Sequence, residues 1–406
     1  MKFNYMKSAA MALAFACCVS SCSDFLEEEN KTGATAELEY ATVSGIDGLM
    51  GSAYSFLRLW AGKPAALAMN GSGTDDLFYG IDCGMKPLGD YTFTAEQDGK
   101  TNFDSYWEAF YCGIDVCNLA LKYVPLNTAI GEAKKQTYLG EAQFLRAFYY
   151  FMLVNHFGAP YNYNKQALGV PLKLDSNLLP EDQLLMTRNT VEEVYNQIVD
   201  DLNEAERLFL TLSKDKQYEP NYLVSLPMIQ LLKSRVFLYM ENWKDAAIYA
   251  NKVIKDWSFA LVDLNNLPSP TVAEPYYNFT SLKSSEVIWL YGSVSDLTVF
   301  NDESVEYEEE GYFGNTTTYY REAFIASDNL IESFEDGDLR KEKYIAKEFN
   351  KDDKVFYEDS YTTFGKYKLS ATGEPSGSEN FALSFRLGEA YLNLAEAAAH
   401  NNDEST

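Results

Sequence analysis

Histidine, the side chain that most often transfers protons or binds metal ions near neutral pH, is almost missing from this sequence. Only His156 and His400 are present. His156 falls on the apolar stripe of a predicted helix, where we interpret it as a buried structural residue, and His400 falls at a fraying helix end. Histidine-dependent catalytic triads and metal sites therefore lack the residues that they need.

Other short catalytic and metal-binding motifs are missing as well. The sequence has no Gly-x-Ser-x-Gly elbow, no phosphate-binding loop, no dinucleotide fingerprint and no calcium-loop pattern. The six cysteines form no CxxC pattern, and Cys112 and Cys117 are five residues apart on a predicted helix, which disfavours a disulfide between them. We therefore expect no catalytic residues, no metal and no cofactor.

The 60 acidic residues leave one enzymatic alternative open. Glycosidases use two carboxyl groups about 5–10 Å apart, and only the folded chain shows whether such a pair exists. Asp75-Asp76 is the nearest candidate, although a loop cap or an acceptor for a sugar hydroxyl is the simpler interpretation. We predict that the chain is not an enzyme and keep a secreted glycosidase as an alternative.

Two irregular segments combine aromatic rings with short polar side chains, a mixture suited to sugars because rings stack on pyranose faces and polar groups pair with hydroxyls. Residues 60–93 and 301–320 are these segments. Our candidate ligand-binding residues are Trp60, Asp75, Asp76, Tyr79, Tyr312, Phe313, Tyr319 and Tyr320. The alternative for each aromatic residue is that its ring only packs the loop onto the scaffold.

Helical periodicity predicts the elements that position these segments. The central one lies in Thr137–Tyr163, which is apolar nearly all round from Phe144 onward and ends at Gly158 and Pro160, as a buried soluble helix would. The other predicted helices are Thr42–Trp60, Asn102–Val124, Thr190–Phe209 (opened by a capping box), Ser225–Met240, Trp243–Asp256 and Leu383–Ala399. Trp107 and Trp243 are expected in the core.

Two further expectations concern the C-terminal part of the chain. Glu286–Tyr291 has the composition of a strand. The last predicted helix carries an apolar stripe that requires a partner helix, and the chain reaches Thr406 without supplying one. The stripe consists of Leu387, Tyr391, Leu394, Ala395 and Ala398.

The charge and the N-terminus limit the partners. A net charge of −27 argues against nucleic-acid binding, which needs a basic surface, and against electrostatic adhesion to anionic lipid. Residues 1–22 are typical of a secretory leader, because lysines precede an apolar run, Ala9–Val19, that is too short to span a bilayer.

Four segments resemble the SusD/RagB family of outer-membrane nutrient-binding lipoproteins of Bacteroidetes. They are EAQFLRAFYYF at Glu141–Phe151, CSDFLEEE from Cys22, SSEVIWLY at Ser284–Tyr291 and LSFRLGEAYLNLAEAAA at Leu383–Ala399. The resemblance implies a mainly α, SusD-like fold, in which tetratricopeptide-like hairpins form a scaffold with irregular loops and a few short strands on one side. It also implies lipidation of Cys22 and attachment to the outer membrane, facing the cell exterior.

The same resemblance implies an organisation of the chain. Residues 1–21 would be the signal peptide, 22–40 a lipidated acidic tether and 41–406 one SusD-like domain that is shorter at its C-terminus than in the family. Its helical-repeat parts would be 102–256 and 383–400, and its ligand-loop parts 60–100 and 257–340.

The expected role is capture of a glycan and its delivery to a SusC-like TonB-dependent transporter. The alternatives are the same role with a peptide ligand, as in the RagB branch, or the glycosidase considered above.

Overall fold

The computed structural model describes residues 36–61, 77–78, 102–176, 186–218, 223–267, 285–291, 325–344, 346–350, 355–362 and 382–401. The leader, Cys22 and the tether up to residue 35 lie outside these ranges. The longer helices are α3 (Val43–Ala61), α6 (Asn102–Leu126), α7 (Glu132–Phe157), α9 (Val191–Leu210), α10 (Leu226–Tyr239), α11 (Trp243–Asp256) and α14 (Leu387–Asn401). Shorter helices are α2 (Ala36–Glu39), α12 (Asp328–Glu332), α13 (Leu339–Tyr344) and two 3-10 turns, Lys214–Lys216 and Leu264–Asn266.

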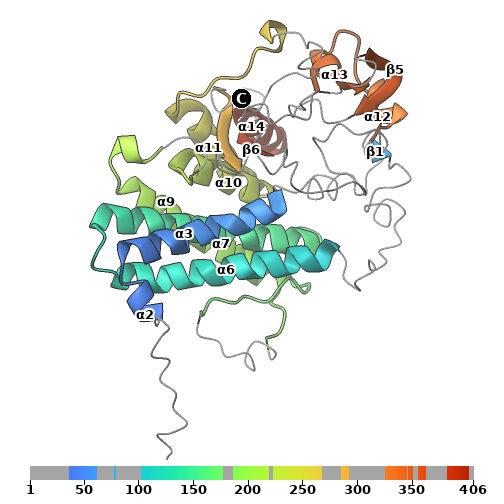
Figure 1. Cartoon of the computed structure of the whole chain (residues 1–406). Coiled ribbons are helices and arrows are strands. Elements are labelled where there is room, and N and C mark those ends of the chain that lie inside the picture. The colour runs from blue at the N-terminus through green and yellow to red at the C-terminus, as the bar shows by residue number, and fades with distance from the viewer. Residues whose placement is uncertain are drawn as a thin grey trace, which may run out of the picture.

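These long helices form one array in which each packs against the next along the chain. The contacts run from α3 to α6, α7, α9, α10, α11 and finally α14. Figure 1 shows α3, α6 and α7 lying alongside one another, with α10, α11 and α14 above them. Packing between sequence neighbours is characteristic of helical-hairpin scaffolds. The mainly α fold is therefore confirmed.

The central helix predicted from the sequence is α7. Its side chains from Gly140 to Val154 are buried except at Gln143 and Met152, so that α7 contributes on all sides to the main apolar core. The helix ends at Phe157, and the N–H of Gly158 donates to the carbonyl of Val154 (2.9 Å). Both the burial and the stop agree with the sequence pattern.

Local start signals were also predicted correctly. The Thr190 side chain accepts from the backbone N–H of Glu193, and the Glu193 carboxylate accepts from the N–H of Thr190 (2.8 Å), which is the expected capping box of α9. Pro227 lies in the first turn of α10. Trp107 and Trp243 are only half-buried and lie at the rim of the core rather than inside it.

The predicted helix Leu383–Ala399 is wrong in its first part. Residues Ala382–Arg386 form strand β6, which pairs antiparallel with β2 (Val287–Tyr291), the strand expected from the sequence. Phe385 of β6 is fully buried and packs against Trp289 of β2 at 5.3 Å between ring centroids. Pairing with a strand nearly a hundred residues earlier overrides the local helical pattern, and the helix begins at Leu387.

The expected lack of a partner for this last helix is also wrong, because α11 supplies one. Ala390 and Ala397 of α14 are buried, as are Ala246 and Ala250 of α11, and these small side chains let the two helices approach closely. The buried face also differs from the predicted stripe, since Tyr391 and Ala395 are exposed. His400 stacks on Trp243 at 3.9 Å with an interplanar angle of 5°, so it is held at the helix end rather than fraying.

Two small sheets accompany the helices. The first consists of β2 and β6, and the ring of Trp289 in β2 meets Phe144 and Phe148 of α7 edge-on, both at 5.9 Å. The second is antiparallel in the order β1 (Leu77–Phe78), β3 (Ile325–Ala326), β5 (Val355–Thr362) and β4 (Ala346–Asn350). In Figure 1 this sheet lies with α12 and α13 at one side of the molecule, beside the helical array.

Candidate functional site

The four-stranded sheet contains one strand from the first predicted ligand-binding segment and one strand that closely follows the second. Strand β1 pairs with β3, with Leu77 opposite Ala326 and Phe78 opposite Ile325. In the sequence, β1 stands directly between Asp76 and Tyr79, and β3 begins five residues after Tyr320. Because paired strands lie side by side, this pairing places a strand of the first segment beside a strand that follows the second by five residues.

The candidate residues themselves are almost all outside the described ranges. Trp60 lies in the last turn of α3, where the structure describes the backbone but not the side chain. Asp75, Asp76, Tyr79, Tyr312, Phe313, Tyr319 and Tyr320 fall in undescribed segments. Their role in binding remains a prediction, and what the structure adds is that a strand within the first segment pairs with a strand that follows the second.

Inside the helical array, the buried charges of Arg146 and Asp201 are paired with each other. Arg146 donates to Asp201 through Nε (2.8 Å) and Nη2 (2.6 Å), and its Nη1 donates to Asn118 (2.8 Å). Paired and hydrogen-bonded charges of this kind are normal inside proteins. We interpret this group as a structural connection between α6, α7 and α9.

A second buried group surrounds Glu206 of α9. The ammonium groups of Lys233 and Lys252 both bind its carboxylate, and the hydroxyl of Tyr249 also donates to it (2.9 Å). Burial alone would raise the pKa of Glu206, but the two lysines outweigh it and hold that pKa below its usual range. Burial lowers the pKa of Lys233. These three charged groups and the Tyr249 hydroxyl form a cluster that joins α9, α10 and α11.

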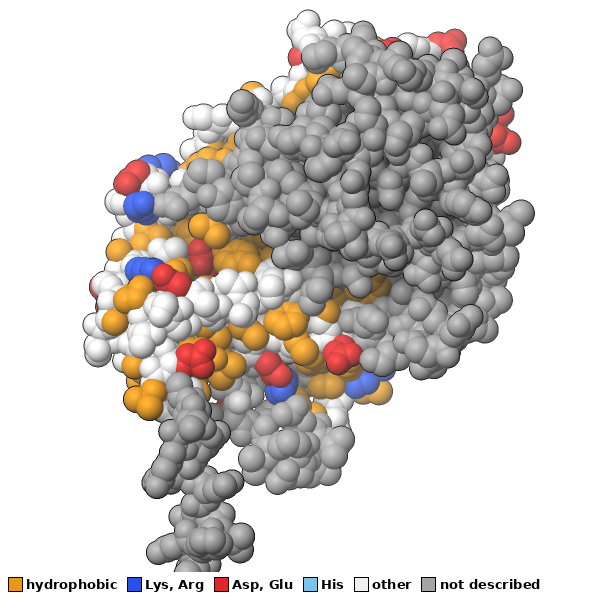
Figure 2. Space-filling model, viewed as in Figure 1, with side chains coloured by type: hydrophobic (Ala, Val, Ile, Leu, Met, Phe, Trp, Pro, Cys, Tyr) orange, Lys and Arg blue, Asp and Glu red, His pale blue; other side chains and the backbone are white. Residues whose placement is uncertain are grey.

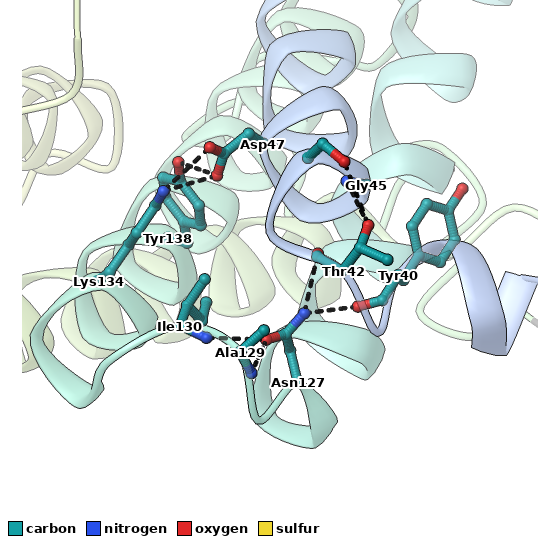
Figure 3. Close-up of polar contacts among 10 residues, drawn as sticks. Tyr40, Thr42, Gly45, Asp47, Asn127, Ala129, Ile130, Lys134 and Tyr138 are labelled. Carbon is teal, nitrogen blue, oxygen red and sulfur yellow. Dashed lines mark hydrogen bonds and ion pairs between the residues drawn. The ribbon is translucent and has the colours of Figure 1, made fainter.

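The segment that enters the fold from the tether is held by Asn127, at the turn between α6 and α7 (Figure 3). The Asn127 amide donates to the carbonyls of Tyr40 (2.7 Å) and Thr42 (3.1 Å), and its oxygen accepts from the N–H groups of Ala129 and Ile130. Next to it, Asp47 of α3 binds Lys134 and Tyr138 of α7. Asn127 could not be recognised from the sequence, because its partners lie about 85 residues earlier.

The surface of the described helices carries charges of both signs, which bears on the expectation that the chain binds no nucleic acid. On the face shown in Figure 2, the described part of the helical array carries acidic and basic side chains close to one another, interspersed with apolar ones. No continuous basic surface, as nucleic-acid binding would require, is visible on the described part of this face.

Metal chemistry and membrane spans can be assessed for the described ranges. Within them, no group of three or more His, Cys, Asp or Glu side chains could hold a metal ion. Cys112 and Cys117 are both free thiols, and burial raises the pKa of each. No helix in the part of the chain that the structure describes is long and apolar enough to cross a bilayer.

The comparisons with known proteins agree on one family. Residues 88–225 match the SusD-like family model that is described as "Starch-binding associating with outer membrane". The SusD-like protein P38 of Formosa agariphila is 30% identical over 155 residues, which cover 38% of this chain and 27% of that protein. Residues 88–225 of this chain are therefore similar to the SusD-like family, and the match to P38 spans less than a third of that relative's length.

Solved structures show the same fold at lower identity. A SusD superfamily protein from Bacteroides thetaiotaomicron aligns with a TM-score of 0.69 at 20% identity, over 89% of this chain and 77% of that one. Surface glycan-binding protein A from Bacteroides uniformis aligns with a TM-score of 0.59 at 20% identity, over 89% and 76%. The SusD-like fold expected from the sequence is thus confirmed, whereas nothing in these matches distinguishes a RagB-like branch.

Proposed function

We propose that this SusD-like chain captures glycans at the outer membrane and delivers them, uncut, to a SusC-like TonB-dependent transporter. The observation that supports the proposal is the pairing of β1, which lies within the first aromatic and polar segment, with β3, which begins five residues after the second. The starch-binding description of the family and the glycan-binding name of one structural relative support a carbohydrate as the ligand.

In this proposal the candidate residues divide by chemistry. Trp60, Tyr79, Tyr312, Phe313, Tyr319 and Tyr320 stack on pyranose rings, and Asp75 and Asp76 accept hydrogen bonds from sugar hydroxyls. No step requires a proton donor or a nucleophile, so the chain acts as a binding protein and not as an enzyme.

The proposed location follows from the N-terminal sequence. Acyl chains on Cys22 would hold the protein at the outer face of the outer membrane, since two or more chains are needed for stable attachment. The tether would then meet the fold at α2, and Asn127 binds the carbonyls of Tyr40 and Thr42 between α2 and α3.

The test is a glycan-array screen of the chain from Ser23 onward, followed by calorimetry on any ligand found. We expect one class of oligosaccharide to bind and to remain uncleaved after long incubation. Replacing Tyr79 or Tyr312 with alanine should weaken binding about 2–10-fold each, corresponding to the loss of one aromatic contact of about 0.5–1.5 kcal/mol.

The matched control is Tyr391→Ala, because this tyrosine is exposed on α14, within the helical array. Its replacement should leave glycan affinity unchanged. A folded sample that binds no glycan would refute the proposal and direct attention to peptide ligands. Hydrolysis of the bound oligosaccharide would contradict the non-catalytic role.

A further inference from the structure

The segment that follows α7, residues 160–166, presents an aromatic ring to solvent. Tyr163 is 83% exposed, the highest value among the large apolar and aromatic side chains in the described part of the chain. Single exposed apolar groups are normal on protein surfaces. Tyr163, however, is not isolated, because a second exposed ring and several side-chain amides lie beside it.

A second exposed ring lies beside the same segment. The Asn162 side-chain amide donates to the carboxylate of Glu241, which places the segment against the turn between α10 and α11. Tyr239, in the last turn of α10, is 50% exposed, and its ring is supported by an edge contact with Phe151 at 5.2 Å. The two tyrosines therefore lie close to the Asn162–Glu241 hydrogen bond. Tyr163 directly follows Asn162, and Tyr239 precedes Glu241 by two residues.

The side-chain amides of this segment are each held at one end. The oxygen of Asn164 accepts from the backbone N–H of Gln166 (3.0 Å), and the Gln166 amide donates to Glu192 (2.7 Å). Three groups have no partner among the described residues: the side-chain nitrogen of Asn164 and the side-chain oxygens of Gln166 and Asn162. They offer oriented donors and acceptors to whatever lies above the segment.

The backbone of the segment is fixed as well. The N–H of Tyr163 donates to the Pro160 carbonyl (3.1 Å), and the N–H of Glu192 donates to the Lys165 carbonyl (2.9 Å). Tyr161 is buried against Tyr195 at 4.8 Å. A ligand would therefore meet groups that are already ordered, which lowers the entropy lost on binding.

We propose that these residues form a second carbohydrate-binding surface, the Tyr163 surface, made of Asn162, Tyr163, Asn164, Gln166 and Tyr239. Amphipathic tyrosine rings next to half-used amides suit a neutral saccharide, whose ring faces are apolar and whose rim carries hydroxyls. Two rings are too little apolar area for a stable protein interface of about 800 Å² on each side. The inference rests on the proposed function, because both surfaces take a glycan.

The Tyr163 surface belongs to the helical array, whereas in the proposed function the glycan binds beside the four-stranded sheet, where β1 pairs with β3. A polysaccharide that contacts both surfaces gains affinity from the second contact, because that contact becomes intramolecular once the first has formed. An oligosaccharide that fills only the proposed site beside the four-stranded sheet, the sheet-side site, gains no affinity from the Tyr163 surface. A comparison of polysaccharide affinity with oligosaccharide affinity therefore distinguishes the contributions of the two sites.

The experiment is affinity electrophoresis of the chain from Ser23 onward in gels containing the polysaccharide it binds, with calorimetry on a short oligosaccharide of the same linkage. We expect Tyr163→Ala to weaken polysaccharide binding about 3–10-fold and to leave oligosaccharide binding unchanged. Tyr163→Phe keeps the ring and should retain most of the affinity. Tyr391→Ala is the matched exposed tyrosine on α14 and should behave as wild type.

A second set of variants tests the surface without the sheet-side site. In a Tyr79→Ala/Tyr312→Ala background, residual retardation by the polysaccharide should persist and should disappear when Tyr163→Ala is added. If Tyr163→Ala binds the polysaccharide as wild type does, the inference is overturned while the proposed function stands. If folded wild type binds no glycan at all, both fail together.

Discussion

The ring of Tyr149 in α7 lies directly on the backbone of Gly113 in α6. A β-carbon added at Gly113 would come within 2.6 Å of the Tyr149 ring, closer than real contacts of this kind. The hydroxyl of Tyr149 donates to the carbonyl of Ala53 in α3 (2.6 Å). One buried side chain thus joins three helices, and it fits only because residue 113 has no side chain.

This contact predicts opposite effects for two glycine-to-alanine substitutions. Gly113→Ala should destabilise the fold by about 1–3 kcal/mol through overpacking, although alanine favours helices. Gly51→Ala in α3, where an added β-carbon meets nothing within 4 Å, should stabilise it by about 0.5–1 kcal/mol. Urea unfolding of both variants measures the difference, and equal effects at the two positions would show that the close contact does not matter.

A second prediction concerns the buried pair formed by Arg146 and Asp201. Arg146→Met leaves the Asp201 carboxylate buried without its partner, and we expect a loss of about 3–5 kcal/mol. The double variant Arg146→Met/Asp201→Leu removes both charges and should lose clearly less than the single one. Denaturant unfolding of the variants measures this.

The control for that pair is the exposed ion pair of Arg207 with Glu204, in which both side chains are largely in solvent. Arg207→Met should change stability little, because exposed pairs contribute little. A double variant of Arg146 and Asp201 that loses the sum of its two single variants would argue against electrostatic coupling.

His156 makes stability depend on pH. Burial lowers the pKa of this imidazole below its usual value, and the hydrogen bond from Nδ1 to the Met152 carbonyl (2.7 Å) only partly opposes that effect. Below the unfolded-state pKa of about 6.5, the unfolded chain takes up a proton that the folded chain resists, so stability is lost as pH falls through this range.

The measurement is unfolding free energy between pH 7.5 and 5.5 for wild type and His156→Gln. The variant should lose less stability over this interval, and the sequence has only one other histidine, His400. Parallel curves for the two proteins would mean that His156 is protonated as readily in the folded chain as in the unfolded one.

Local signals in the sequence predicted the elements that depend on local contacts. The capping box at Thr190 and Glu193 and the stop at Gly158 involve residues within a few positions, and both appear as expected. Leu383–Arg386 was assigned to a helix because its strand partner, β2, lies nearly a hundred residues away. The partner of α14 was missed for the same reason, since α11 precedes it by about 140 residues.

The candidate site shows the same limit. The aromatic and polar composition of residues 60–93 and 301–320 could be recognised in the sequence, but the pairing of β1 with β3 could not. Strands β1 and β3 have two residues each, which is too short for an alternating pattern to be recognised.

The last prediction concerns Glu241, whose backbone conformation is strained but whose side chain accepts a hydrogen bond. It ends α10 in the left-handed region with φ of 56°, where glycine is preferred, and its carboxylate accepts the hydrogen bond from Asn162. Glu241→Gly should relieve about 1 kcal/mol of backbone strain but lose a hydrogen bond worth up to about 1 kcal/mol, leaving stability nearly unchanged.

The two effects can be separated in a double-mutant cycle. In an Asn162→Ala background the hydrogen bond is already lost, so Glu241→Gly should stabilise the fold by about 1 kcal/mol. Glu241→Ala is the control, because it removes the same carboxylate but keeps the strained backbone, and it should stabilise neither background. Thermal unfolding of these variants measures the coupling. If glycine at 241 stabilises both backgrounds equally, Asn162 and Glu241 are not coupled, and the segment around Tyr163 is not held in place by this contact.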